Sequence, residues 1–299
     1  MSFLLTVPET LDDHGFESVA AGWVEGKGEN LLLDARHVQW VSPYGILGLL
    51  AIGTAWRNRE GERPILKPPE SQRVKTYLAR IGFYSLAKEI FEIEGPILHR
   101  VERTSDSLLE ITAIRNHMDV HGVVDRVKDR ANVILARLGY PQTSVMQFSV
   151  ILSEVCQNIV EHANADGWVA AQTYNWKARL GRLVVVIGVM DIGIGFSGSL
   201  AREHAQSHGD HWSDAKALES AFLHGLSRFR DPGRGQGLQA IRRQTSKWHG
   251  LVTIRSGTAQ IAEVPDWAER KPLIGGLPDF PGAQIQVVVP QVSPNAGDR

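Results

Sequence analysis

Three polar residues recur every four positions in the segment VILSEVCQNIVEHA (150–163): Glu154, Asn158 and His162. On an α-helix, this spacing places the three side chains along one stripe. Apolar residues of the same segment occupy the other face, so the stripe is free to meet a ligand. The alternative interpretation is an ordinary amphipathic helix whose polar stripe is solvated.

A second segment, VVVIGVMDIGIGF (184–196), is predicted to be a buried strand that ends at Asp191 and continues into Gly193 and Gly195. The glycines let the backbone turn sharply and approach a ligand without a Cβ in the way. An ionised aspartate only accepts hydrogen bonds, so Asp191 can take a donor such as the amino group of adenine. A turn with an acidic cap is the alternative, because a single Gly-x-Gly is common.

The third segment is GRGQGL (233–238), which leads into a predicted helix at Gln236–Lys247. Glycines before a helix leave backbone N–H groups free at the positive end of the helix dipole, which favours phosphate. The alternative is a flexible hinge before a surface helix.

Composition limits the class of protein. The chain has 299 residues, 43% hydrophobic and 22% charged, with 32 basic and 33 acidic side chains. This balance opposes nucleic acid and anionic membranes as partners. The sequence shows no signal peptide and no apolar run long enough for a bilayer, so we expect a cytoplasmic protein. Its one cysteine, Cys156, excludes a disulfide framework and is predicted to be inert packing.

Strands alternate with helices along the chain, which predicts an α/β fold class. The predicted strands are 4–7, Asn30–Asp34, 64–67, Leu108–Ile114, 167–174, Arg182–Asp191, 251–256 and 284–289. The predicted helices are 44–57, 73–81, 120–138, 143–163 and Gln236–Lys247. Residues 196–233 are predicted to be a long, polar, mobile segment. Its His204, His208 and His211 are interpreted as solvated, with a zinc site as the alternative.

Together the three segments resemble the N box, G1 box, ATP lid and G2 box of the Bergerat-fold (GHKL) family, over residues 108–290. The resemblance implies helices sandwiched on a mixed sheet. A further family element, Gly-Thr, is represented by Gly282 and Ala283. Because alanine replaces the threonine, its hydroxyl is missing, and one possible contact to phosphate is lost.

The run SEVCQNIVEHA resembles the bacterial anti-sigma-factor serine kinases. That resemblance implies ATP and Mg²⁺ as cofactors, with Asn158 binding Mg²⁺, Glu154 as the catalytic base and Asp191 binding the adenine N6 group. The remaining nucleotide-binding residues that it implies are Gly193, Gly195, Gly233, Arg234, Gly235, Gly237 and Leu238.

Residues 30–53 resemble the core of a STAS domain, the fold of anti-sigma-factor antagonists. Tyr44 stands where that family has its phosphorylated serine, and Ser42 replaces the usual aspartate. We therefore expect two α/β domains, a STAS-like domain at 1–97 and a Bergerat-fold domain at 98–292, followed by a disordered tail at 293–299.

The function expected from these resemblances is partner switching by a serine/threonine protein kinase or anti-sigma-like regulator. Its partners would be ATP or ADP and a protein, either a sigma factor, an antagonist or another STAS-like protein. The alternatives are an ATPase whose lid closure drives a conformational cycle and a non-catalytic ATP-sensing scaffold. Homodimer formation is left open.

Overall fold

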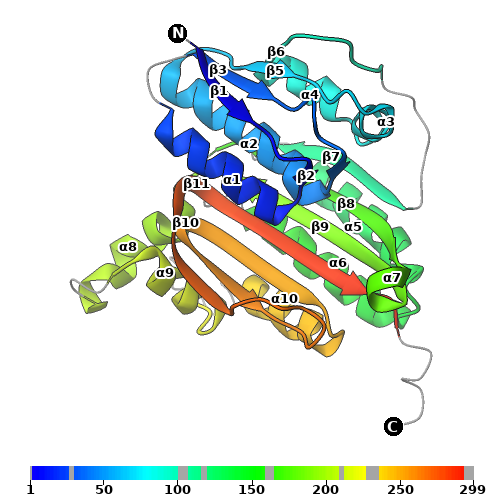
Figure 1. The fold of residues 1–299 in the computed structure, drawn as a ribbon. Helices are drawn as coiled ribbons and strands as arrows, with labels where there is room; N and C mark the ends of the chain where they lie inside the picture. The colour runs from blue at the N-terminus through cyan, green and yellow to red at the C-terminus, as the bar shows by residue number, and fades with distance from the viewer. Residues whose placement is uncertain are drawn as a thin grey trace. The chain divides into compact units, whose positions relative to one another are not determined.

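The computed structural model describes residues 2–26, 30–99, 107–115, 120–158, 165–208, 212–226 and 236–292. The structure is mixed α/β, with both parallel and antiparallel strand pairs (Figure 1). Within these ranges, none of the helices combines the length and apolar character that crossing a bilayer requires.

The chain forms two compact units, which are described separately. The first comprises Met1–Ser105 together with Pro278–Phe280, and the second comprises Asp106–Leu277 and Pro281–Arg299. The division into independent domains at residues 97 and 98 stays a prediction.

The sheet of the first unit has four parallel strands in the order β1-β3-β5-β6. These strands are β1 (Ser2–Thr6), β3 (Asn30–Asp34), β5 (Ile65–Lys67) and β6 (Glu92–Ile93). Two short strands, β2 (Thr10–Leu11) and β4 (Trp40–Val41), form a separate parallel pair. The helices are α1 (Asp13–Glu25), α2 (Pro43–Glu60), α3 (Gln72–Arg80) and α4 (Phe83–Ile90). Parallel strands joined by helices agree with the predicted α/β pattern, although α1 and α4 were not predicted.

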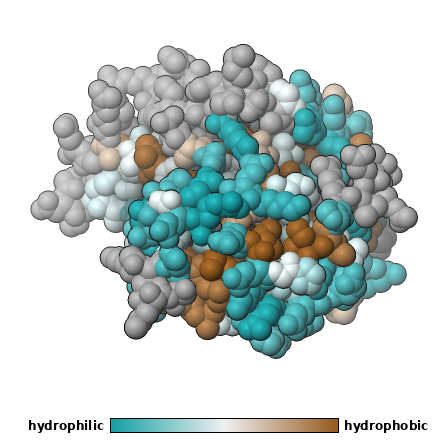
Figure 2. Space-filling view, turned by 90° about the horizontal axis from the view of Figure 1, so that it is seen from above, coloured by the Kyte–Doolittle hydropathy of each residue, from teal (hydrophilic) through white to brown (hydrophobic). Residues whose placement is uncertain are grey.

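The two faces of this sheet differ in burial. Leu5, Leu33 and Leu66 occupy matching positions on neighbouring strands and are all buried. On the opposite face, Leu4 is 57% exposed. Helices α1 and α2 lie on one side of the sheet (Figure 1). Seen from above that view, the surface of the molecule shows apolar side chains among hydrophilic ones (Figure 2). The sheet therefore has one covered face and one more open face.

Phe280 belongs to the core of the first unit although it lies far along the chain. Its side chain is fully buried. Its ring centroid lies 5.3 Å from that of Phe16 and 5.1 Å from that of Trp23, both in edge-on geometry. Such aromatic contacts add to the free energy gained from burial alone.

The second unit contains a five-stranded sheet in the order β10-β11-β9-β8-β7. Its strands are β7 (Leu108–Ile114), β8 (Gly167–Trp176), β9 (Arg182–Asp191), β10 (Leu251–Glu263) and β11 (Leu273–Pro290). The pairs β7–β8, β8–β9 and β9–β11 are antiparallel. Its helices are α5 (Val120–Ala136), α6 (Gln142–Asn158), α7 (Lys177–Leu180), α8 (Gly195–His208), α9 (Asp214–Phe222) and α10 (Gln236–Lys247).

The main core of this unit lies between its sheet and its helices. Buried residues of α5, α6, α9 and α10 form one cluster with inward-facing residues of all five strands. In Figure 1, α5, α6 and α10 lie along the same side of the sheet. A smaller cluster on the other face contains Val184, Val186, Leu251 and Val288.

The prediction of an unstructured segment at 196–233 is wrong where the structure describes it. Helix α8 covers Gly195–His208, and α9 covers Asp214–Phe222. Leu218 and Phe222 of α9 are buried in the main core. Asp214 fixes α9 to β10, because its carboxylate accepts hydrogen bonds of 2.8 Å from both the backbone N–H and the hydroxyl of Thr258. Burial of the apolar side of α9 overrides the polar composition that suggested mobility.

Candidate functional site

Asp191 stands at the end of the central strand β9 and is only 6% exposed. The run of apolar residues before it keeps β9 buried from Val184 to Asp191, with β8 on one side and β11 on the other. The chain then turns through Gly193 and enters α8 at Gly195. Strand burial therefore carries a carboxylate into a region that is poor in water.

The described part of the chain supplies Asp191 with two backbone donors. The N–H of Gly193 donates to Oδ1 at 2.8 Å, and the N–H of Ala283 also bonds to the carboxylate. Burial raises the pKa of Asp191 to about 7, and the two backbone hydrogen bonds only partly oppose that rise. Desolvation penalises the charged form, so this carboxylate is poised to change charge near neutral pH.

Strand β11 approaches Asp191 closely at Gly282. A Cβ at Gly282 would lie 2.1 Å from the carbonyl oxygen of Asp191, and the φ of Gly282 is +82°. Both facts require glycine at this position. The predicted counterpart of the Gly-Thr element is thus adjacent to the predicted adenine-binding aspartate, which the sequence alone could only suggest.

Ser256 on β10 ties the turn after β9 to β11. Its hydroxyl donates to the carbonyl oxygen of Gly282 at 2.8 Å and accepts from the backbone N–H of Phe196 at 3.0 Å. Gln284 adds a bond of 2.8 Å from its amide nitrogen to the carbonyl oxygen of Pro281. These bonds hold the turn rigidly around Asp191. The sequence analysis missed Ser256 and Gln284, because neither belongs to a local motif.

Arg255 is fully buried beside this network. Its guanidinium donates to the carbonyl oxygen of Gly257 at 3.1 Å and to Oε1 of Gln284 at 3.4 Å. A charge without water must be satisfied by fixed acceptors, and the removal of either partner would leave it poorly solvated. Arg255 therefore helps to fix the position of Gln284.

The predicted helix stripe lies on α6. Leu152, Val155 and Cys156 are buried on one face, and Glu154 is exposed on the other, as the spacing predicted. Burial raises the pKa of the Cys156 thiol to about 12, which agrees with its prediction as inert packing. Asn158 is the last described residue of α6, so its side chain and His162 lie outside the described residues.

The glycine-rich segment before α10 is described only in part. Gly233, Arg234 and Gly235 lie outside the described residues. Gly237 is in the first turn of α10, and Leu238 is 9% exposed and joins the main core. Asp191, Gly193 and Gly195 thus lie close together, at the turn between β9 and α8. Glu154 lies on α6, and Gly237 and Leu238 lie on α10.

Among the described residues, no group of three or more histidine, cysteine, aspartate or glutamate side chains could hold a metal ion. The predicted Mg²⁺ site uses one amide oxygen together with phosphate oxygens and water, so it is of a different kind. No protein-family model matches the chain, and no curated protein matches its sequence.

Proposed function

We propose that the second unit binds Mg·ATP and that Asp191 recognises adenine. The observation that carries this proposal is the unused hydrogen-bonding capacity of a buried carboxylate. A carboxylate has about four acceptor positions. The described residues fill two of them, through the backbone N–H groups of Gly193 and Ala283. A ligand amino group would satisfy a further position and offset part of the cost of burying the charge.

The chemistry of Asp191 favours adenine over guanine. Adenine presents an exocyclic amino group, which donates, where guanine presents a carbonyl oxygen, which accepts. An ionised carboxylate accepts only, so it attracts the first and repels the second. The rigid support from Ser256 favours recognition, because a fixed acceptor discriminates better than a mobile one.

The same proposal assigns the phosphate end of the nucleotide. Asn158 would hold Mg²⁺ through its amide oxygen, and Gly233, Arg234, Gly235 and Gly237 would contact the phosphates. Glu154 would act as the base that orients a serine or threonine hydroxyl of a protein partner. Phosphoryl transfer depends mainly on positioning and charge stabilisation, so this small set of groups suffices. Partner switching by protein phosphorylation is therefore the activity that we favour.

Titration calorimetry of the full chain with Mg·ATP and Mg·GTP tests adenine recognition. We expect the parent protein to bind ATP more tightly than GTP. Asp191→Ala should lower the affinity for ATP and reduce the ratio of ATP affinity to GTP affinity. Asp266→Ala is the matched control, because Asp266 is an exposed aspartate of the same unit. Equal losses for ATP and GTP in Asp191→Ala would show that Asp191 is a structural cap.

Incubation with γ-labelled ATP, Mg²⁺ and cell extract tests the activity. Label on a protein supports the kinase. Free phosphate alone would indicate an ATPase, and neither product would indicate an ATP sensor.

Two variants separate binding from chemistry. Asn158→Ala should abolish Mg²⁺-dependent ATP binding. Glu154→Ala should bind ATP normally and transfer phosphate poorly, because a base acts mainly in the transition state.

A further inference from the structure

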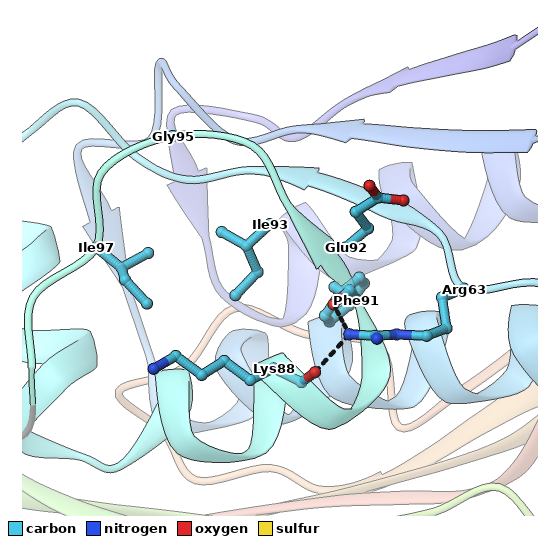
Figure 3. A pocket seen from close by; sticks show the side chains of 7 residues that line it. All are labelled: Arg63, Lys88, Phe91, Glu92, Ile93, Gly95 and Ile97. Atoms are coloured by element: carbon cyan, nitrogen blue, oxygen red, sulfur yellow. Dashed lines mark hydrogen bonds between the residues drawn. The ribbon is translucent and has the colours of Figure 1, made fainter.

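A pocket of about 580 Å³ opens on the first unit, beside the edge strand β6. This volume is within the range of small-molecule sites. The pocket is lined by Arg63, Lys88, Phe91, Glu92, Ile93, Gly95 and Ile97 (Figure 3). It lies wholly within the first unit, whereas the proposed nucleotide site belongs to the second.

Arg63 forms a fixed end of the pocket. Its guanidinium donates from Nη2 to the carbonyl oxygens of Lys88 and Phe91, at the C-terminal end of α4. These bonds complement the negative end of the helix dipole and orient the guanidinium. A guanidinium has five N–H donors, so Nε and Nη1 retain donors for a further acceptor.

Lys88 supplies a second positive charge. Its side chain runs beneath Ile93 toward Ile97, with the ammonium group at the far end (Figure 3). The carboxylate of Glu92, the one acidic residue of the lining, points away from the pocket. Within the described residues, neither Arg63 nor Lys88 forms an ion pair. The lining thus carries two positive charges and one negative charge, in a chain whose formal net charge is −1.

The rest of the wall is apolar and held in place. Ile93 and Ile97 point into the pocket above the Lys88 chain. Ile97 follows Gly95, whose φ of +134° only glycine readily adopts, and a Cβ there would lie 3.3 Å from Cδ of Pro68. Backbone N–H groups of Glu92 and Glu94 bond to the carbonyl oxygens of Pro64 and Leu66. The curved segment that carries Ile97 is therefore anchored to β5.

We propose that this pocket binds a small amphipathic carboxylate. The carboxylate would pair with the Lys88 ammonium, and the aliphatic or aromatic body would pack against Ile93 and Ile97. Neither the carboxylate nor the apolar body would bind tightly by itself, because an exposed ion pair contributes little binding free energy and the apolar wall is short. A neutral apolar molecule would leave the Lys88 ammonium unpaired, and a small anion would leave the two isoleucines in water.

Titration calorimetry of the full chain with octanoate tests this proposal, with octanamide and acetate as partial ligands. Octanoate should bind at least threefold more tightly than octanamide, which lacks the charge, and more tightly than acetate, which lacks the body. No binding of octanoate, or equal binding of octanoate and octanamide, would overturn the proposal.

Two variants locate the site. Lys88→Met keeps the aliphatic stem and removes the charge, so octanoate affinity should fall about threefold to fivefold while octanamide is unaffected. Ile97→Ala should weaken octanoate about fivefold and leave acetate unchanged. Lys75→Met on α3, outside the pocket, is the matched control. Melting curves verify that each variant folds, and equal octanoate affinity in Lys88→Met and Lys75→Met would refute the assignment.

Discussion

Ser42 in the first unit and Asp191 in the second occupy similar places, each between a strand and a helix, and each is almost fully buried. Their hydrogen bonding differs. The hydroxyl of Ser42 accepts from the N–H of Gly45 at 3.0 Å and caps α2, so its burial is compensated locally. Asp191 retains acceptor capacity and a strongly raised pKa. A buried polar group that is costly to keep is the better candidate for function.

The largest effect that tests this contrast is on stability. The pKa of Asp191 is about 7 in the folded protein and about 3.8 in its ordinary state, so the folded form binds more protons between those values. Its contribution to the free energy of unfolding is therefore full below about pH 4 and lost as pH rises to about 7. The loss is up to about 4 kcal/mol, at ~1.4 kcal/mol per pKa unit.

Denaturant unfolding from pH 4 to 8 measures this loss. Asp191→Asn cannot ionise, so the variant should lose less stability than the parent over that range. If the free energy of unfolding depends on pH equally in the parent and the variant, Asp191 is not desolvated as the structure indicates.

The next effect is on nucleotide affinity. Asp191→Asn removes a charge-assisted hydrogen bond, worth about 1.5–3 kcal/mol, so ATP affinity should fall by roughly 10-fold to 100-fold. The amide of the variant can also donate to the carbonyl oxygen of guanine, so the affinity for GTP should fall less than the affinity for ATP. Binding measured above pH 7 provides the comparison, and an unchanged ATP-to-GTP ratio would exclude direct base contact.

In the parent protein, ATP affinity should also decline as pH falls below about 7, because protonation of Asp191 removes its charge. Asp191→Asn should lack this decline. Calorimetry at pH 6 and pH 8 checks both proteins, and a decline of equal size in the variant would assign the pH dependence to another group.

Ser42→Ala should have a smaller and different effect. Loss of the helix cap should lower the free energy of unfolding by about 1 kcal/mol and leave nucleotide affinity unchanged. Unfolding and binding measurements on one preparation separate the two outcomes. A large fall in ATP affinity would contradict the structural role of Ser42.

The smallest expected effect is on phosphorylation of the first unit, which should be absent at Ser42 and Tyr44. Both side chains are at most 2% exposed, and Ser42 has the extended backbone that a following proline imposes. Mass spectrometry after incubation with Mg·ATP checks this expectation. Stoichiometric phosphate on either residue would show that a phosphorylation switch operates in the first unit.

Elements with a continuous apolar run were predictable from the sequence. The bounds of β3, β7, β9 and α10 agree with their predictions, because each has a clear periodicity and a clear end. Helix α1 was missed, since Gly15 and Gly22 lower its helix propensity. In the structure those glycines permit close packing, as a Cβ at Gly22 would lie 2.2 Å from Cδ1 of Leu5.

The candidate site was predictable only where its residues are local in sequence. Asp191, Gly193 and Gly195 form one motif, so the turn could be identified. Ser256 bonds to Phe196 and to Gly282, which are 60 and 26 positions away, and no local pattern encodes such partners. The support of the site therefore required a structure, whereas its central carboxylate did not.

The burial of Phe280 in the first unit has a consequence for how the protein is made. The residues of that unit up to Ser105 leave the ribosome long before Phe280 does. At ~5–20 residues per second, the gap is on the order of ten seconds or more. During this interval Phe16 and Trp23 lack the ring that later packs against them. The nascent first unit would thus lack one ring of its aromatic core until synthesis is nearly complete.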